Sequence, residues 1–160
     1  MLPAAFPSDV IYFEALEIRQ PSEDTLRVVI AEAVVRAEVD EIHGELKMRA
    51  SPITVGPDSR VFAFLWDNFV AYTMTLESYY LPEAEKPVAQ TGVFREFSQS
   101  RYLADLRAAT FAEAVHRKVM RHWQLATLNH IVDVAGWNPP EVRHLKSYKL
   151  PDPDTGIERH

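Results

Sequence analysis

The segment SRVFAFLWDNFVAYTMTLESYY, residues 59–80, limits the fold more than any other part of the chain. Its aromatic, β-branched and threonine side chains suit the pleated surface of a β-sheet. Alternation gives each half of the segment one apolar face, formed by Phe62, Phe64 and Trp66 in the first half and by Val70, Tyr72, Met74 and Leu76 in the second. Asp67 and Asn68 between the halves suit a tight turn. The segment therefore predicts two antiparallel strands that form a hairpin.

Three further stretches also have the pattern of strands. Residues 10–18 are rich in β-branched and aromatic residues, and residues 91–97 form another short strand pattern. HWQLATLNHIVDVAG, residues 122–136, divides into two short strands about a turn near 128–130, because asparagine tolerates left-handed turn geometry. In the first of these strands Trp123 and Leu125 face the core, while His122 and Gln124 lie on the opposite face.

One segment, TLRVVIAEAVVRA at residues 25–37, fits two structures. Its apolar residues fall on one helical face, and Ser22 can cap a helix that starts here. The same residues also alternate as a strand, and four valines with an isoleucine favour that state. The residues themselves leave the choice between helix and strand open.

One helix is predicted with a clear start, at SQSRYLADLRAAT. Ser98 or Ser100 can cap it, and Leu103 and Leu106 point inward. We expect a principal helix around residues 99–111. The same spacing continues in Phe111, Val115 and Val119, so the helix can also run on through residues 111–120.

These elements, in a chain of 160 residues of which 47% are hydrophobic, predict one globular domain over residues 1–150. We expect an α+β fold, mainly antiparallel β-sheet, curled into a sandwich or a partly open barrel with one principal helix. The final residues, 151–160, are proline-spaced and charged, which predicts a loosely ordered tail.

Composition excludes several classes of function. The chain has no cysteine, which excludes disulfides, thiolate zinc sites and cysteine nucleophiles. A net charge of -6 with scattered basic residues argues against nucleic acid and membrane surfaces as partners. No apolar run is long enough to span a bilayer, and MLPAAFPSDV lacks the features of a signal peptide, so we expect a cytoplasmic protein.

Metal and cofactor sites are not predicted. His116, His122 and His130 are six and eight residues apart, so no two of them share one face of a helix as zinc ligands do. The chain also has neither a glycine-rich phosphate loop nor a G-x-S-x-G nucleophile turn. We therefore expect no metal and no cofactor.

A candidate pocket can be assembled from polar residues of the predicted strands. Glu77 alternates onto the face opposite Tyr72, Met74 and Leu76, together with Thr75 and Tyr79. Grouped hydroxyls and a carboxylate suit either a polar pocket or an exposed sheet surface. His122 and Asp133 can pair across the second hairpin, although an alternating strand also favours Asp133 on the water-facing side. The candidate pocket consists of Glu77, Tyr79, Thr75, His122 and Asp133.

The chain resembles a family of uncharacterised bacterial proteins over residues 10–143, most specifically after residue 59. The shared pattern is an aromatic strand that ends in tryptophan, a Tyr-x-x-x-x-Glu-Ser strand, a Ser-x-x-Leu helix start, and a His-aromatic strand that leads to Val-Asp-Val. The matching positions are Trp66, Tyr72, Glu77, Ser78, Ser100, Leu103, His122, Trp123, Val132, Asp133 and Val134. The resemblance implies a strand at residues 25–35 and a helix that stops near 111. The chain departs from the family at AVHRKVM, where a short loop with glycine or proline is expected, and the resemblance implies no activity.

Two classes of function are consistent with these features. We expect a non-catalytic binding or protein-interaction domain that takes a protein or small-molecule partner and can form a homodimer. The alternative is a small metal-independent enzyme that uses a Glu/His/Asp polar cluster.

Overall fold

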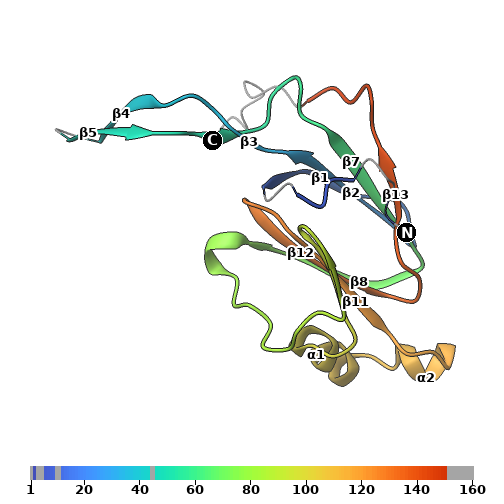
Figure 1. Cartoon of the computed structure of the whole chain (residues 1–160). Helices are drawn as coiled ribbons and strands as arrows, with labels where there is room; N and C mark the ends of the chain where they lie inside the picture. Colours follow the sequence, from blue (N-terminus) through green and yellow to red (C-terminus); the bar gives the residue numbers. More distant parts are fainter. Residues whose placement is uncertain (1, 3–5, 10–11, 44–45, 151–160) are drawn as a thin grey trace, which may run out of the picture.

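The computed structural model describes residues 2, 6–9, 12–43 and 46–150, with the backbone alone at 39–43 and 46–48 (Figure 1). The predicted tail, residues 151–160, lies outside these residues. Within the described part of the chain no helix has the length and apolar character needed to cross a membrane.

Two antiparallel sheets stack face to face to form the body of the molecule (Figure 1). The first sheet has the order β1-β2-β7-β13, with β1 at Phe13–Ser22, β2 at Thr25–Glu32, β7 at Val61–Asp67 and β13 at Glu141–His144. The second has the order β8-β12-β11-β10-β9, with β8 at Phe69–Leu76, β12 at His130–Gly136, β11 at Arg121–Ala126, β10 at Phe94–Phe97 and β9 at Ala89–Thr91. This arrangement confirms the predicted α+β fold built mainly from antiparallel strands. It is sandwich-like and not a closed barrel.

A two-stranded arm projects from the first sheet (Figure 1). At its base β3 (Val34–Val35) pairs with β6 (Ile53–Thr54), and further out β4 (Val39–His43) pairs with β5 (Leu46–Ala50). The segment that fitted both helix and strand is therefore extended: it forms β2, which pairs with both β1 and β7, and then β3. Its β-branched residues favour this outcome because Val28–Ala31 are buried on both faces of the first sheet.

The predicted hairpin of residues 59–80 is wrong in its pairing, although both strands form where expected. β7 pairs with β2 and β13, whereas β8 pairs with β12 in the other sheet. Asn68, with φ at 53°, turns the chain between the two sheets. The face of Phe62, Phe64 and Trp66 enters the core as predicted. The predicted face of β8 does not hold together: Tyr72 packs against the core, Val70 packs on the outer side of the sheet after a register irregularity, and Met74 and Leu76 are about half exposed.

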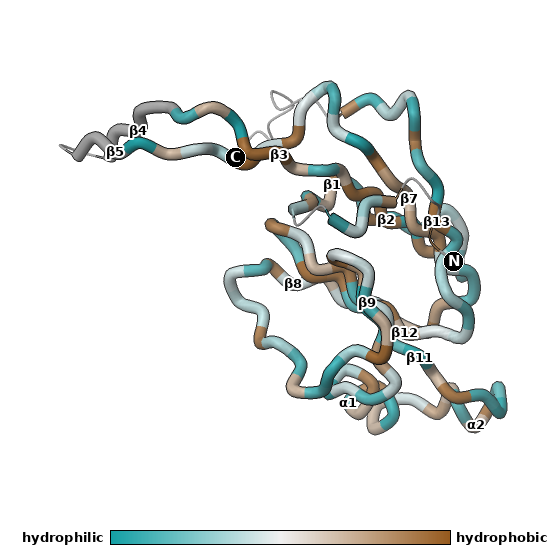
Figure 2. Tube along the Cα trace, viewed as in Figure 1, coloured by the Kyte–Doolittle hydropathy of each residue, from teal (hydrophilic) through white to brown (hydrophobic). Residues whose placement is uncertain are grey.

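The core between the sheets is dominated by aromatic and branched aliphatic residues. Figure 2 shows hydrophobic residues concentrated in the strands of both sheets. The largest fully buried side chains of the interior include Phe13, Phe62, Phe64, Trp66 and Trp123. Trp123 faces the core from β11, as its place in the alternation predicts.

The principal helix, α1, spans Arg101–Ala109, and Ser100 caps it by accepting a hydrogen bond from the Leu103 amide at 3.0 Å. The alternative expectation, that this helix continues through residue 120, is wrong. The helix ends because Thr110 adopts an extended conformation, although its amide and its hydroxyl still donate to the Leu106 carbonyl. A separate short helix, α2 at Ala112–His116, follows and ends at Arg117 in the left-handed conformation.

The outer face of the second sheet is covered, and this covering creates the candidate site. The chain leaves β8 in a 3-10 turn, η1 at Glu77–Tyr79, and residues 77–88, here called the covering segment, lie over this face. The chain then forms β9 and β10 of the sheet and continues into α1. Leu103 of α1 is fully buried together with Ala135 of β12, so the helix packs on the outer face of the sheet.

Candidate functional site

A row of polar side chains crosses the covered face of the second sheet. Thr73 of β8 lies directly opposite Asp133 of β12, which lies opposite Gln124 of β11, which lies opposite Arg95 of β10. Directly opposite residues of antiparallel strands point to the same face, so the register itself places these side chains together. Asp133 is 4% exposed and Gln124 is 2% exposed, so the centre of the row is buried, whereas Thr73 at its β8 end is exposed and Arg95 at its β10 end is half-buried.

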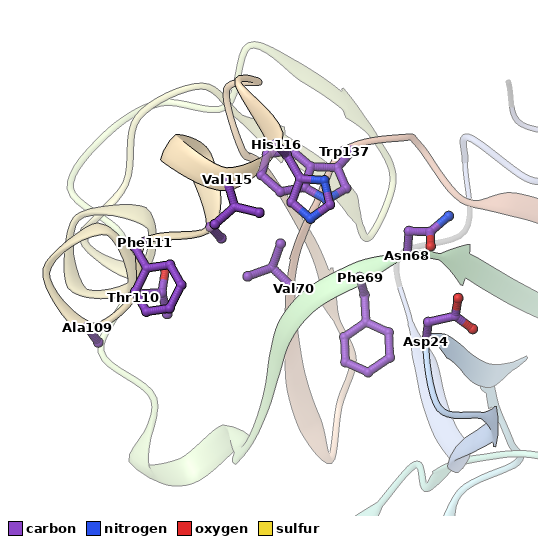
Figure 3. A pocket seen from close by; sticks show the side chains of 11 residues that line it. Asp24, Asn68, Phe69, Val70, Ala109, Thr110, Phe111, Val115, His116 and Trp137 are labelled. Atoms are coloured by element: carbon purple, nitrogen blue, oxygen red, sulfur yellow. The ribbon is translucent and has the colours of Figure 1, made fainter.

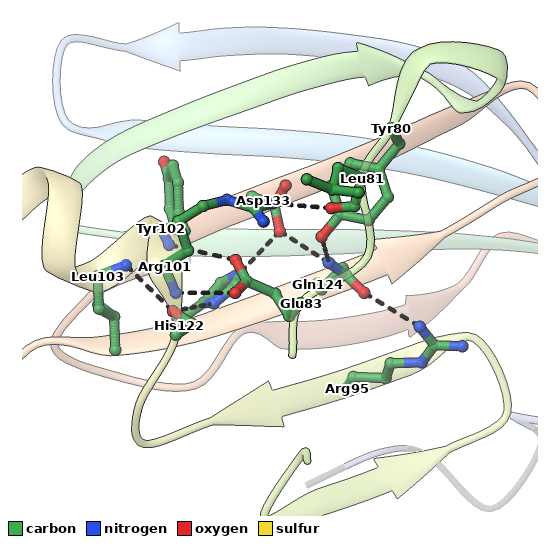
Figure 4. A network of polar contacts seen from close by, with 11 residues as sticks. Tyr80, Leu81, Glu83, Arg95, Arg101, Tyr102, Leu103, His122, Gln124 and Asp133 are labelled. Atoms are coloured by element: carbon green, nitrogen blue, oxygen red, sulfur yellow. Dashed lines mark hydrogen bonds and ion pairs between the residues drawn. The ribbon is translucent and has the colours of Figure 1, made fainter. Parts of the chain in front are cut away.

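His122 lies beside this row and is fully buried. Its Nδ1 lies 2.8 Å from the Ser100 hydroxyl, and its Nε2 lies 2.7 Å from Asp133 Oδ1 (Figure 4). The imidazole stacks on the Phe97 ring, with centroids 4.9 Å apart. The histidine thus joins the start of α1 to β12 through two side-chain contacts.

Gln124 extends the network to the covering segment and to β10. Its amide nitrogen donates to Asp133 Oδ1 at 2.9 Å and to the Tyr80 hydroxyl at 2.7 Å. Its carbonyl oxygen accepts from Arg95 Nη1 at 3.2 Å (Figure 4). The Gln124 amide therefore lies between the buried carboxylate and the guanidinium.

The hydrogen bonds of this network agree with one another in direction. The Leu103 amide donates to Ser100 Oγ, which leaves the Ser100 hydroxyl free to donate to His122 Nδ1. His122 Nε2–H then donates to Asp133, which also accepts from Gln124. A neutral imidazole satisfies every one of these groups, as a buried polar network requires.

The amides at the start of α1 are occupied as well. Glu83 accepts hydrogen bonds from the Arg101 amide at 2.8 Å and from the Tyr102 amide at 3.2 Å. The Arg101 side chain donates to the Leu81 carbonyl at 2.7 Å, which ties the covering segment to the helix. A carboxylate is favourable at a helix N-terminus, so this contact holds the cover over the network.

Two tyrosines at the edge of the network have perturbed acidity. Burial raises the pKa of Tyr102 to about 12; the charge of Asp133 adds to the rise, and Thr73 opposes it. The Tyr102 hydroxyl approaches Thr73 without a hydrogen bond of normal geometry. Burial, followed by the charge of Asp133, also raises the pKa of Tyr80.

The structure brings together some of the five candidate pocket residues and separates others. His122 and Asp133 are in direct contact. Thr75 lies on the same face of the sheet and lines a hollow of about 220 Å³ with Tyr79 and Asp133. Glu77 lines a different hollow, of about 360 Å³.

Two expectations about these residues are wrong. Glu77 and Tyr79 do not continue the alternation of β8, because the strand ends at Leu76 and a 3-10 turn follows; Tyr79 is 80% exposed. Asp133 does not face water, because the covering segment and α1 lie over that face of the sheet. Alternation identifies the face of a strand, but it does not report whether another segment covers that face.

Four residues of the network were missed: Gln124, Tyr80, Arg95 and Tyr102. The sequence contains one signal for Gln124. It comes two residues after His122, so both side chains lie on the same face of their strand. With Asp133 on the next strand they form a polar stripe across two otherwise apolar strands. Ser100 was predicted as a helix cap, which it is, and its contact with His122 is additional. Among the described residues no group of three or more histidine, aspartate or glutamate side chains could hold a metal ion.

A second site is an apolar groove where β8 begins (Figure 3). It has a volume of about 570 Å³ and lies between the chain from Ala109 to His116 and residues Phe69, Val70 and Trp137. Phe111 is 79% exposed and Val115 is 63% exposed, so the side of the groove formed by α2 presents apolar side chains to solvent. The groove is therefore open and hydrophobic, in contrast to the closed polar network.

Comparisons with known proteins identify no relative of this chain: no family model, no curated protein and no solved structure matches it.

Proposed function

We propose that this chain is a non-catalytic protein-interaction domain that receives an extended segment of a partner along the free edge of β8. The observation that carries the proposal is that β8, FVAYTMTL, is an edge strand of eight residues with no charge, no proline and no glycine. An edge strand presents unpaired backbone N–H and C=O groups, which an extended peptide can pair with.

The other three edges of the two sheets carry features that discourage pairing. β1 contains charged residues and two register irregularities. β13 has four residues, two of them charged, and follows Pro139 and Pro140. β9 has only three residues and lies between Pro87 and Gly92. Charges, bulges, prolines and short length are the usual means by which proteins protect their edge strands, so the uncharged β8 edge is the exception.

The apolar groove adjoins this edge because Phe69 and Val70, the first two residues of β8, also line the groove. A segment that adds to β8 can therefore place an apolar side chain in the groove, between Val70 and Val115 (Figure 3). Backbone pairing would supply affinity, and the groove would supply specificity, as in other cases of strand addition. The partner we propose is an extended, uncharged segment of another protein with one large apolar residue at its anchor position.

The Ser100–His122–Asp133 chain is the observation that favours an enzyme instead. Such a chain serves a hydrolase only if the serine is accessible and amides near it can stabilise an oxyanion. Here His122 is fully buried, and Glu83 and Ser100 already accept the first amides of α1. These contacts support a structural role for the three residues, in which they fasten α1 to the sheet.

The proposal can be tested with a phage-displayed library of 12-residue peptides panned on the full chain, followed by fluorescence anisotropy of the enriched peptide. We expect the enriched peptides to be uncharged over six or more residues and to share an apolar anchor. Val115→Glu and Met74→Lys should each weaken binding by about tenfold, because they place a charge in the groove and on the edge.

Matched controls are available in the chain. Val88→Glu alters a residue with 62% exposure, close to the 63% of Val115, and Val35→Lys alters a residue with 54% exposure, close to the 51% of Met74. Neither control should change binding. Equal affinity for Val115→Glu, Met74→Lys and the wild type would contradict the proposal. If sedimentation velocity finds a dimer that Met74→Lys dissociates, β8 is the interface and a second copy is its partner.

A further inference from the structure

A second hollow lies apart from the apolar groove beside β8. It is the hollow of about 360 Å³ beneath the covering segment, and Gln124 and Arg95 of the sheet line it. Its volume is within the range of pockets that hold small ligands. Apolar contact is offered by Phe97, Ala126 and Ile131, and polar contact by Tyr80, Gln90 and Thr127.

Arg95 is the unusual residue of this hollow. Its Nη1 donates to Gln124, but its Nε is buried and has no hydrogen-bond partner. Among the residues that the structure describes, no carboxylate forms an ion pair with Arg95, in contrast to Arg60 and Arg121, which pair with Glu32 and Glu96. A partly buried guanidinium without a carboxylate is costly, and its planar donors match a carboxylate in two-point geometry.

The rim of the hollow carries the opposite charge. Glu77 and Glu85 line it, are exposed, and form no ion pair among the described residues. Glu83 also lines it but is engaged by the amides of α1. Carboxylates at the rim repel a ligand with net negative charge and attract an ammonium group. A ligand that satisfies both the guanidinium and the rim carries one carboxylate and one protonated amine.

We infer that the hollow lined by Arg95, Gln124, Glu77 and Glu85 binds a small zwitterion of amino-acid size. The carboxylate of the ligand pairs with Arg95, its ammonium group lies toward Glu77 and Glu85, and an apolar side chain contacts Phe97 and Ile131. The Gln124 amide is held by Asp133 and Tyr80, so its carbonyl is already directed toward Arg95 and keeps the guanidinium in place.

The test is isothermal titration calorimetry of the full chain with the twenty common amino acids. We expect binding of amino acids with apolar side chains, and we expect Arg95→Gln to weaken it by about tenfold or more because a charge-assisted contact is lost. Glu85→Gln should weaken it by about threefold, because a rim carboxylate is solvated. Glu23→Gln, an exposed glutamate in the turn after β1, should not change it.

Two further probes separate the parts of the site. The amide of the best amino acid lacks the carboxylate, and its deaminated analogue lacks the ammonium group; both should bind more weakly than the parent. Addition of the best-binding amino acid to the wild type should shift the side-chain amide resonances of Gln124 in a ¹⁵N spectrum. This measurement detects binding at the site even if Arg95→Gln does not fold. Absence of heat with all twenty amino acids, or equal binding of the amide, would overturn the inference. Neither result affects the β8 proposal, which uses other residues.

Discussion

At the scale of single residues, the buried network makes a few polar side chains depend on one another. His122 satisfies Ser100 and Asp133 at once, and Asp133 also accepts from Gln124. When a buried polar group loses its partner, its desolvation is no longer compensated. This desolvation penalty is larger than the net free energy that the hydrogen bond contributes to folding. The network therefore acts as a unit, and removal of its central ring should affect all of its members.

We expect His122→Ala to lower the free energy of unfolding by roughly 3–5 kcal/mol, because it leaves a cavity against Phe97 and strands two buried polar partners. Urea denaturation followed by tryptophan fluorescence measures this change. His116→Ala, at an exposed position in α2, is the control and should cost less than about 1 kcal/mol. If His122→Ala kept the stability of the wild type, the structural role would be wrong and the Ser–His–Asp chain would return as a catalytic candidate.

Tyr102 gives a prediction about pH. In the unfolded chain its hydroxyl ionises near the ordinary pKa of 10.0, whereas burial raises the pKa in the folded state to about 12. Between these values the unfolded state loses a proton that the folded state retains, so the contribution of Tyr102 to stability is complete below pH 10 and is lost as pH rises toward 12.

The difference in stability between the wild type and Tyr102→Phe isolates this effect from other groups that titrate at high pH. We expect the wild type to lose about 2–3 kcal/mol more than Tyr102→Phe between pH 9 and pH 12. Tyr79→Phe, which removes a hydroxyl from a side chain that is 80% exposed, is the control variant. Parallel curves for the wild type and Tyr102→Phe would show that the hydroxyl is not desolvated in the folded protein.

At the scale of elements, local pattern predicted the strands and the helix start but not their partners. The alternation of Phe62, Phe64 and Trp66 predicts a buried face, and Ser100 three residues before Leu103 predicts a helix cap. Both features depend only on residues that are close in the sequence. Whether β7 pairs with β8 or with β2 depends on how two apolar faces meet in space. A local pattern does not contain that information.

The candidate site was likewise predictable only in part. His122 and Asp133 were placed in one candidate pocket, because antiparallel pairing brings their strands together. Their burial was not predicted, because it results from the covering segment, residues 77–88, and from α1, which lie far from β12 in the sequence. Asn129 provides a similar case: its side chain accepts from the Ala15 amide at 2.9 Å and donates to the Ala15 carbonyl at 3.0 Å. These two hydrogen bonds attach the turn between β11 and β12 to β1. The turn propensity of asparagine predicts the turn but not this long-range contact.

At the scale of the whole molecule, the two proposals use surfaces of the second sheet that share no lining residue. The β8 edge and its groove involve Phe69, Val70 and α2, whereas the hollow at Arg95 involves β10, β11 and the covering segment. The projecting arm belongs to neither surface. β4 and β5 pair only with each other among the described strands, so the arm adds no strand to either sheet.

The arm should therefore be removable without loss of the sandwich. The pairs Val34–Thr54 and Val35–Ile53 close its base, and the Arg36 amide donates to the Pro52 carbonyl at 2.7 Å. Replacing residues 37–51 with Asn-Gly, a sequence suited to a two-residue hairpin turn, joins strands that are already paired. We expect the melting temperature, followed by circular dichroism, to stay within about 2 °C of the wild type, because surface changes of this kind cost little. A fall of about 5 °C or more would mean that the arm supports the first sheet, since a change of that size corresponds to more than 1 kcal/mol in a domain of this length.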